Sequence, residues 1–168
     1  MRTYSDKGFG FLIEDIDNRN ILRALSNHES TISQIIGKPT TVLTQLYNAF
    51  KDNDRFEFYY IPISFDVKQI EKMNKKGSLG RCSEIGFYLN ILALAITAET
   101  GVTISASEGQ FDINSSPAIL LREKLPWEYT EKDKTVTDKE LYDILKPYAN
   151  ELGIPETKIG FVEVEYFG

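Results

Sequence analysis

Cysteine and histidine are almost absent from this chain, since Cys82 and His28 are the only residues of their types among 168. A single cysteine cannot form an intrachain disulfide, which suits the reducing cytoplasm, and one residue of each type cannot build a typical zinc shell. A nucleophilic dyad would have to pair these two residues, but His28 lies in a polar stretch and Cys82 precedes an apolar run typical of packing. The sequence therefore contains no recognisable catalytic or metal motif, and we expect no cofactor.

Long apolar runs are also missing. The most apolar stretch, residues 91–96, lies within residues 85–98, which are fewer than the ~20 residues that a membrane-spanning helix needs. The N-terminal residues lack the apolar segment of a secretion signal. The length fits one domain, and the 42% hydrophobic content is that of a globular protein. We therefore expect a soluble, cytoplasmic protein with a single domain over residues 1–168.

Negative charge is concentrated in the last quarter of the chain. Residues 128–168 hold ten acidic residues against five lysines, a net charge of −5, whereas the whole chain has a net charge of −6. Such a field disfavours nucleic acid or an anionic membrane as the main partner and suits a basic protein surface. A solvated acidic face that only keeps the protein soluble is the alternative. The carboxylates that we expect at a partner interface are Glu128, Glu131, Asp133 and Asp138.

Alternating apolar residues predict strands near both ends of the chain. Phe9, Phe11 and Ile13 recur with the period of two that is typical of a half-buried strand. The segments that we expect to form strands are residues 8–14, 55–61, 102–106 and 158–167.

Helical spacing and capping residues predict helices between these strands. The most apolar helix is expected over residues 84–100, where Ser83 is the N-cap and Gly101 ends the helix, so it should be the central buried element. Ser116 followed by Pro117 reads as the start of another helix. The other expected helices cover about residues 17–26, 42–51, 66–73, 118–124 and 137–152. Asp15 or Asp17 is expected to cap the first of these helices, and Thr137 with Glu140 forms a capping box at the start of the last.

The order of these elements decides the expected fold class. Strands and helices do not alternate regularly, and no internal repeat is visible. We therefore expect an α+β fold in which helices pack on one face of a mostly antiparallel sheet. A doubly wound parallel sheet is the alternative.

A basic, glycine-bearing loop precedes the expected central helix. Its glycines would let the backbone approach a ligand, its basic residues supply positive charge, and the helix N-terminus points N–H groups at the same place. The loop matches neither a Walker A motif nor a dinucleotide-binding turn, and a plain connector is the alternative. The predicted anion site consists of Lys76, Gly77, Ser78, Gly80, Arg81 and Ser83.

These observations favour one function and leave two alternatives. The first is a small acidic cytosolic binding protein without enzymatic activity that inhibits or neutralises a basic or nucleic-acid-associated partner. The second is a binder of, or an enzyme for, a phosphorylated or otherwise anionic small molecule that uses the loop at residues 75–83. The third is a structural or assembly subunit. High Lys, Ile and Asn usage with only six arginines points to an AT-rich bacterial or phage genome.

Overall fold

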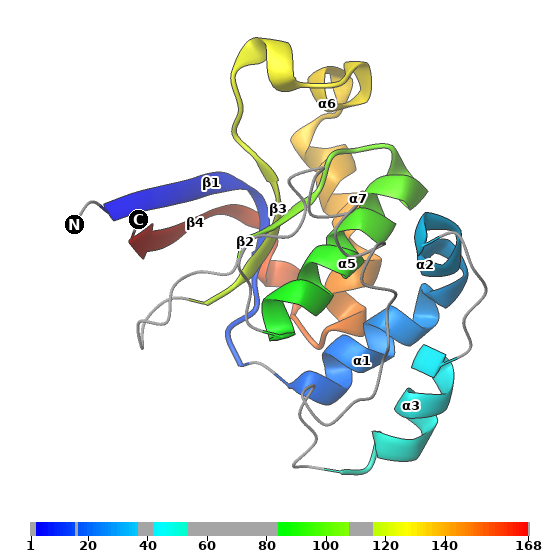
Figure 1. Cartoon of the computed structure of the whole chain (residues 1–168). Helices are drawn as coiled ribbons and strands as arrows, with labels where there is room; N and C mark the ends of the chain where they lie inside the picture. The colour runs from blue at the N-terminus through cyan, green and yellow to red at the C-terminus, as the bar shows by residue number, and fades with distance from the viewer. Residues whose placement is uncertain (1–2, 16, 37–41, 54–83, 108–115, 168) are drawn as a thin grey trace.

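The computed structural model describes residues 3–15, 17–36, 42–53, 84–107 and 116–167. Within them, four strands form one sheet in the order β2-β3-β1-β4, and each neighbouring pair is antiparallel. The strands are β1 (Thr3–Leu12), β2 (Ser105–Ser107), β3 (Ala118–Arg122) and β4 (Gly160–Phe167). The first and last strands of the chain are thus hydrogen-bonded to each other, with the two termini at the same end of the sheet (Figure 1).

The helices lie together on one side of this sheet (Figure 1). They are α1 (Asn18–Asn27), α2 (Glu29–Ile36), α3 (Val42–Phe50), α5 (Glu84–Thr100), α6 (Glu131–Thr135) and α7 (Asp138–Glu151), with short 3-10 turns η2 (Pro126–Glu128) and η3 (Glu156–Lys158). Helix α5 contacts β2 and helix α7 contacts β1. The predicted α+β fold, with an antiparallel sheet and helices on one face, is therefore confirmed.

Helix α5 is the central element of the core, as its sequence predicted. Leu89, Leu92 and Ile96 are fully buried, and Gly101 ends the helix with a φ of +78°, a left-handed conformation that glycine adopts at little cost. None of the helices described is both long and apolar enough to cross a membrane.

The alternation along β1 gives the sheet two apolar faces. Phe11 and Ile13 pack into the main core under the helices, whereas Leu12 joins Leu120 and Val164 in a second cluster on the other face. Gly10 lies on that second face, where a Cβ atom would come within 2.6 Å of the Cα of Leu120. This close approach explains why a residue without a side chain occupies the middle of the strand.

Local capping signals are confirmed at two helices. The Asp17 side chain accepts a hydrogen bond from Arg19 N at 2.9 Å and opens α1. Thr137 likewise accepts from Glu140 N at 3.1 Å and opens α7. The helix predicted for residues 42–51 is present as α3, and the strand at 158–167 as β4.

One prediction of local structure is wrong. Residues 118–124, expected to be helical, form β3, in which every residue from Ala118 to Leu121 is buried. The pair Ser116-Pro117 resembles a helix start, but the Pro117 carbonyl accepts from Ile13 N at 2.8 Å and so extends the sheet pairing. A short, continuously apolar segment fits a central strand as well as a helix, and pairing with strands on both sides decides it.

The remaining predicted strands differ in outcome. The one expected at 102–106 is present only as the shorter β2, although Val102 and Ile104 before it are buried in the core. The expected strand at 55–61 and helix at 66–73 lie outside the described residues.

Candidate functional site

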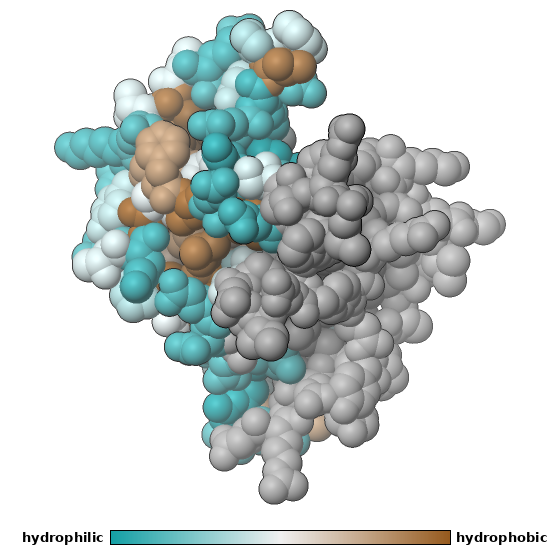
Figure 2. Space-filling view, turned by 90° about the vertical axis from the view of Figure 1, so that its left-hand side faces the viewer, coloured by the Kyte–Doolittle hydropathy of each residue, from teal (hydrophilic) through white to brown (hydrophobic). Residues whose placement is uncertain are grey.

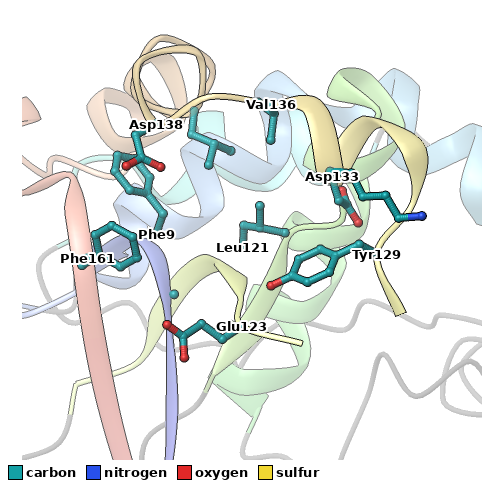
Figure 3. Close-up of a pocket in the computed structure, with 11 residues that line it drawn as sticks. Phe9, Leu121, Glu123, Tyr129, Asp133, Val136, Asp138 and Phe161 are labelled. Atoms are coloured by element: carbon teal, nitrogen blue, oxygen red, sulfur yellow. The ribbon is translucent and has the colours of Figure 1, made fainter. Parts of the chain in front are cut away.

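A cavity of about 290 Å³ opens where β1, β3 and β4 meet α6 and the start of α7 (Figure 3). Its apolar lining comes from Phe9, Leu121, Tyr129, Val136, Leu141 and Phe161. Its charged lining comes from Glu123, Asp133, Lys134 and Asp138. Aromatic rings and carboxylates therefore share one concave surface.

Strand register places the two phenylalanines. Phe9 of β1 lies directly opposite Phe161 of β4, and their rings meet edge to face with centroids 5.6 Å apart. Phe9 packs against the main core, whereas Phe161 is 70% exposed. The side of the molecule that carries the free ends of β1 and β4 displays apolar residues gathered in a patch within hydrophilic surroundings (Figure 2). Because Phe161 is so exposed, the aromatic wall of the cavity is open to an incoming group.

The third ring, Tyr129, is fixed by a local hydrogen bond. Its hydroxyl accepts from Lys124 N at 3.0 Å, and the Lys124 ammonium lies 6.0 Å from the centroid of its ring. The ring therefore keeps its place across the cavity from Phe9 and Phe161 (Figure 3).

Asp133 lines the cavity but serves the fold. Its carboxylate accepts hydrogen bonds from Thr103 N at 2.8 Å and from Thr130 N at 3.1 Å. The Lys124 Nζ atom lies 4.0 Å from the same carboxylate. Burial raises the pKa of Asp133, but the hydrogen bonds from Thr103 and Thr130 outweigh burial and hold that pKa below its ordinary value. This ionised carboxylate caps α6 and ties it to the segment before β2, so it is not free for a partner.

Among the carboxylates that line the cavity, Glu123 and Asp138 have no partner in the described part of the chain. Both are exposed, and within the described part of the chain neither carboxylate has a hydrogen-bond or ion-pair partner. The backbone of Glu123 is held by its N–H, which donates to Lys7 O at 2.7 Å, and Asp138 is the first residue of α7. In Figure 3 they lie on different sides of the cavity, Asp138 near the phenylalanines and Glu123 near Tyr129.

The positive charge in the lining is already engaged. Lys134 Nζ lies 3.4 Å from Glu131 Oε1, one turn earlier on α6. Glu128, in turn, accepts from Leu125 N at 2.8 Å and holds its own turn together. Of the four predicted partner contacts, Asp133 and Asp138 therefore line the cavity, while Glu128 and Glu131 lie outside it.

Sequence reasoning missed Glu123 and the aromatic wall. The period-two pattern assigned Phe9 to one face of a strand, but only the register of β1 with β4 brings Phe161 beside it. Glu123 follows a segment that was expected to be helical, so its place at the end of a strand was hidden. The acidic character of residues 128–168 was the one signal that pointed toward this region.

His28 belongs to a separate, enclosed cluster. Its Nδ1 lies 2.8 Å from Glu99 Oε1 and its Nε2 lies 2.7 Å from Glu151 Oε2, while Tyr148 donates to Glu99 at 3.3 Å. Burial lowers the pKa of His28, but the hydrogen bonds and charges of Glu151 and Glu99 outweigh burial and raise that pKa. Both ring nitrogens are occupied by carboxylates, so neither is free to act as a base or a ligand. Cys82, the other member of the dyad considered above, lies outside the described residues.

The predicted anion site at Lys76, Gly77, Ser78, Gly80, Arg81 and Ser83 also lies outside the described residues. Among the residues that are described, no group of three or more His, Cys, Asp and Glu side chains is arranged to hold a metal ion. Comparisons of this protein with family models, with curated proteins and with solved structures find no match. The function of the cavity is therefore inferred from the residues that line it.

Proposed function

We propose that this is a non-enzymatic binding protein that neutralises a basic partner protein, and that the cavity accepts a lysine or arginine side chain of that partner. One observation carries the proposal: two unpaired carboxylates, Glu123 and Asp138, lie in a lining that also presents three aromatic rings.

The lining is complementary to a long cationic side chain. Aromatic faces attract a cation by about 0.5–2 kcal/mol, and Phe9, Tyr129 and Phe161 offer such rings around one cavity. The buried side chain of Leu121 gives an alkyl stem an apolar surface. The exposed carboxylates of Glu123 and Asp138 add a modest attraction for the cationic head group. A neutral ligand would lack the attraction to the rings and carboxylates, and an anionic ligand would be repelled by the carboxylates.

The surrounding charge favours a protein as the source of this cation. Residues 128–168 have a net charge of −5, and such a field accelerates the approach of an oppositely charged surface. A protein that binds nucleic acid carries a basic surface of this kind. Covering that surface would prevent nucleic-acid binding, which is how the protein would inhibit such a partner.

Small analogues of single side chains test the cavity directly. We expect Nα-acetyl-lysine amide and Nα-acetyl-arginine amide, whose side chains keep their positive charge, to shift the NMR amide signals of Glu123, Asp138 and Phe161. Nα-acetyl-norleucine amide, which lacks the charge, should not shift them. Glu123→Gln or Asp138→Asn should each weaken binding about two- to fivefold, the range for an exposed ion pair.

Glu165→Gln is the matched control, because Glu165 is an exposed carboxylate on β4 outside the lining. It should leave the affinity unchanged. Equal shifts from the lysine and norleucine compounds, or an equal loss in the control variant, would refute the proposal.

A further inference from the structure

Among the residues whose side-chain exposure the structure describes, three large apolar side chains are exposed, one in the lining of the cavity and two on the turn before Tyr129. They are Leu125, Trp127 and Phe161, which are 52%, 77% and 70% exposed. Phe161 lines the cavity, and the other two lie on a short turn whose flanking residues, Glu123 and Tyr129, also line it. Single exposed apolar residues are ordinary, but this concentration beside one concave site marks an interaction surface.

The turn that carries Leu125, Pro126 and Trp127, here the Trp127 turn, is held in one shape. Leu125 N donates to the Glu128 carboxylate at 2.8 Å, and Glu128 N donates to the Leu125 carbonyl at 2.9 Å. Pro126 fixes the backbone at the first position of η2. The exposed indole is therefore presented by an ordered backbone, which reduces the entropy lost on binding.

We infer that the Trp127 turn is the apolar anchor of the same interface, and that Trp127 inserts into an apolar crevice beside the basic residue that the cavity receives. This inference rests on the proposed function, because it assigns the partner. Tryptophan is enriched among the few residues that dominate binding energy in protein interfaces, and rigid presentation favours that role.

Charge around the turn selects a basic partner over a second copy of this chain. Glu123 and Glu128 are exposed on or beside it, whereas the nearby Lys124 ammonium is directed to buried Asp133 at 4.0 Å and the Lys134 ammonium to Glu131 at 3.4 Å. Two copies with a net charge of −6 would bring these carboxylates together. A basic surface meets them with the opposite charge.

The cavity and the anchor should respond differently to salt. Ion pairing in the cavity is screened over about 8–10 Å at ordinary ionic strength, so its contribution falls as salt rises. Burial of the Trp127 ring is an apolar contact and does not weaken with salt in this way. The salt dependence of binding, measured for variants of the cavity and of Trp127, therefore separates the two contacts.

Selection from a displayed library of random 12-residue peptides provides the probe. Wild-type protein should enrich peptides that combine a lysine or arginine with a bulky apolar residue. Trp127→Ala should lose the apolar preference and keep the basic one, and Glu123→Gln/Asp138→Asn should show the reverse. For a synthetic copy of the best peptide, Trp127→Ala should weaken binding about 10- to 30-fold, while Trp127→Phe retains most of the affinity.

The indole also reports the contact itself, because Trp127 is the only tryptophan in the chain. Its fluorescence should shift to shorter wavelength when the peptide binds, and Trp127→Ala should leave the thermal midpoint of unfolding unchanged because the ring is exposed. Enrichment of the same peptides by wild type and Trp127→Ala, unaltered fluorescence on binding, or no apolar enrichment by wild type would overturn the inference. Apolar enrichment without basic residues would instead refute the proposed function.

Discussion

The His28 cluster and the cavity both combine carboxylates with aromatic rings. The carboxylates of the cluster are paired with a histidine, whereas two carboxylates of the cavity have no partner among the described residues. In the cluster, Glu99 and Glu151 each meet a ring nitrogen of His28 within 2.8 Å. In the cavity, Glu123 and Asp138 have no partner within the described residues. The difference separates charges that hold this fold together from charges that remain available to another molecule.

Helix geometry explains why the cluster needs a cation. His28 is the C-cap of α1, Glu99 lies in the last turn of α5, and Glu151 is the last residue of α7. The C-terminal ends of helices carry partial negative charge, to which the two carboxylates add. A protonated histidine, 12% exposed in its side chain, neutralises this convergence of negative charge.

Removing the histidine should have the largest effect on stability. His28→Ala leaves Glu99 and Glu151 partly buried without their cation, and we expect a loss of about 2–4 kcal/mol in the free energy of unfolding. Chemical denaturation at pH 6 measures it. Glu123→Gln is the comparison variant and should change stability by less than about 0.5 kcal/mol. Similar losses in both variants would remove the distinction between the two regions.

A second pair of variants makes the same comparison inside the cavity. Asp133→Ala removes an ionised carboxylate that accepts from two backbone N–H groups, so we expect a loss of about 1–3 kcal/mol. Asp138→Asn, only five residues later, should be nearly neutral because its carboxylate has no partner in the described chain. Thermal unfolding of both variants tests this, and a larger loss in Asp138→Asn would contradict the assignment.

The contribution of the His28 cluster to stability should also depend on pH, which is a smaller effect than its removal. Because the pKa of His28 is raised in the folded state, its contribution is fully present below about pH 6.5, the ordinary histidine pKa, and is lost as pH rises through the raised pKa. The groups facing the ring are Glu99 of α5 and Tyr148 and Glu151 of α7, while Arg23 of α1 donates to the Glu151 carbonyl.

Tyr148 should not titrate in this window. Burial and the charge of Glu99 raise its pKa well above the ordinary range, so it stays neutral. The difference in unfolding midpoint between wild type and His28→Gln should therefore shrink as pH rises above about 6.5. A difference that stays constant from pH 6 to 9 would show that protonation of His28 does not stabilise the fold.

The sequence predicted the scaffold better than the site, for a physical reason. Helix α5, the caps at Asp17 and Thr137, and strands β1 and β4 depend on local spacing, which the sequence displays directly. The cavity depends on strand register and on β3, whose buried run has no distinguishing period.

The charge pattern of the sequence also predicted the site only in part. The acidic last quarter indicated the region, but sequence could not separate Asp133, whose carboxylate caps α6, from Asp138, whose carboxylate is unpaired. That separation depends on which backbone N–H groups the fold brings within hydrogen-bonding distance. His28 was seen as a lone histidine, because its carboxylate partners lie 71 and 123 residues away in the chain.

The most direct test of the central claim is to locate a bound basic side chain by intermolecular nuclear Overhauser effects. With Nα-acetyl-arginine amide in excess, the side-chain methylene protons of the ligand should show contacts to the rings of Phe9, Tyr129 and Phe161, and Glu123→Gln/Asp138→Asn should weaken these contacts clearly at the same ligand concentration. Contacts confined to other surfaces, or contacts that persist unchanged in the double variant, would contradict the claim that these unpaired carboxylates form a site for a basic partner.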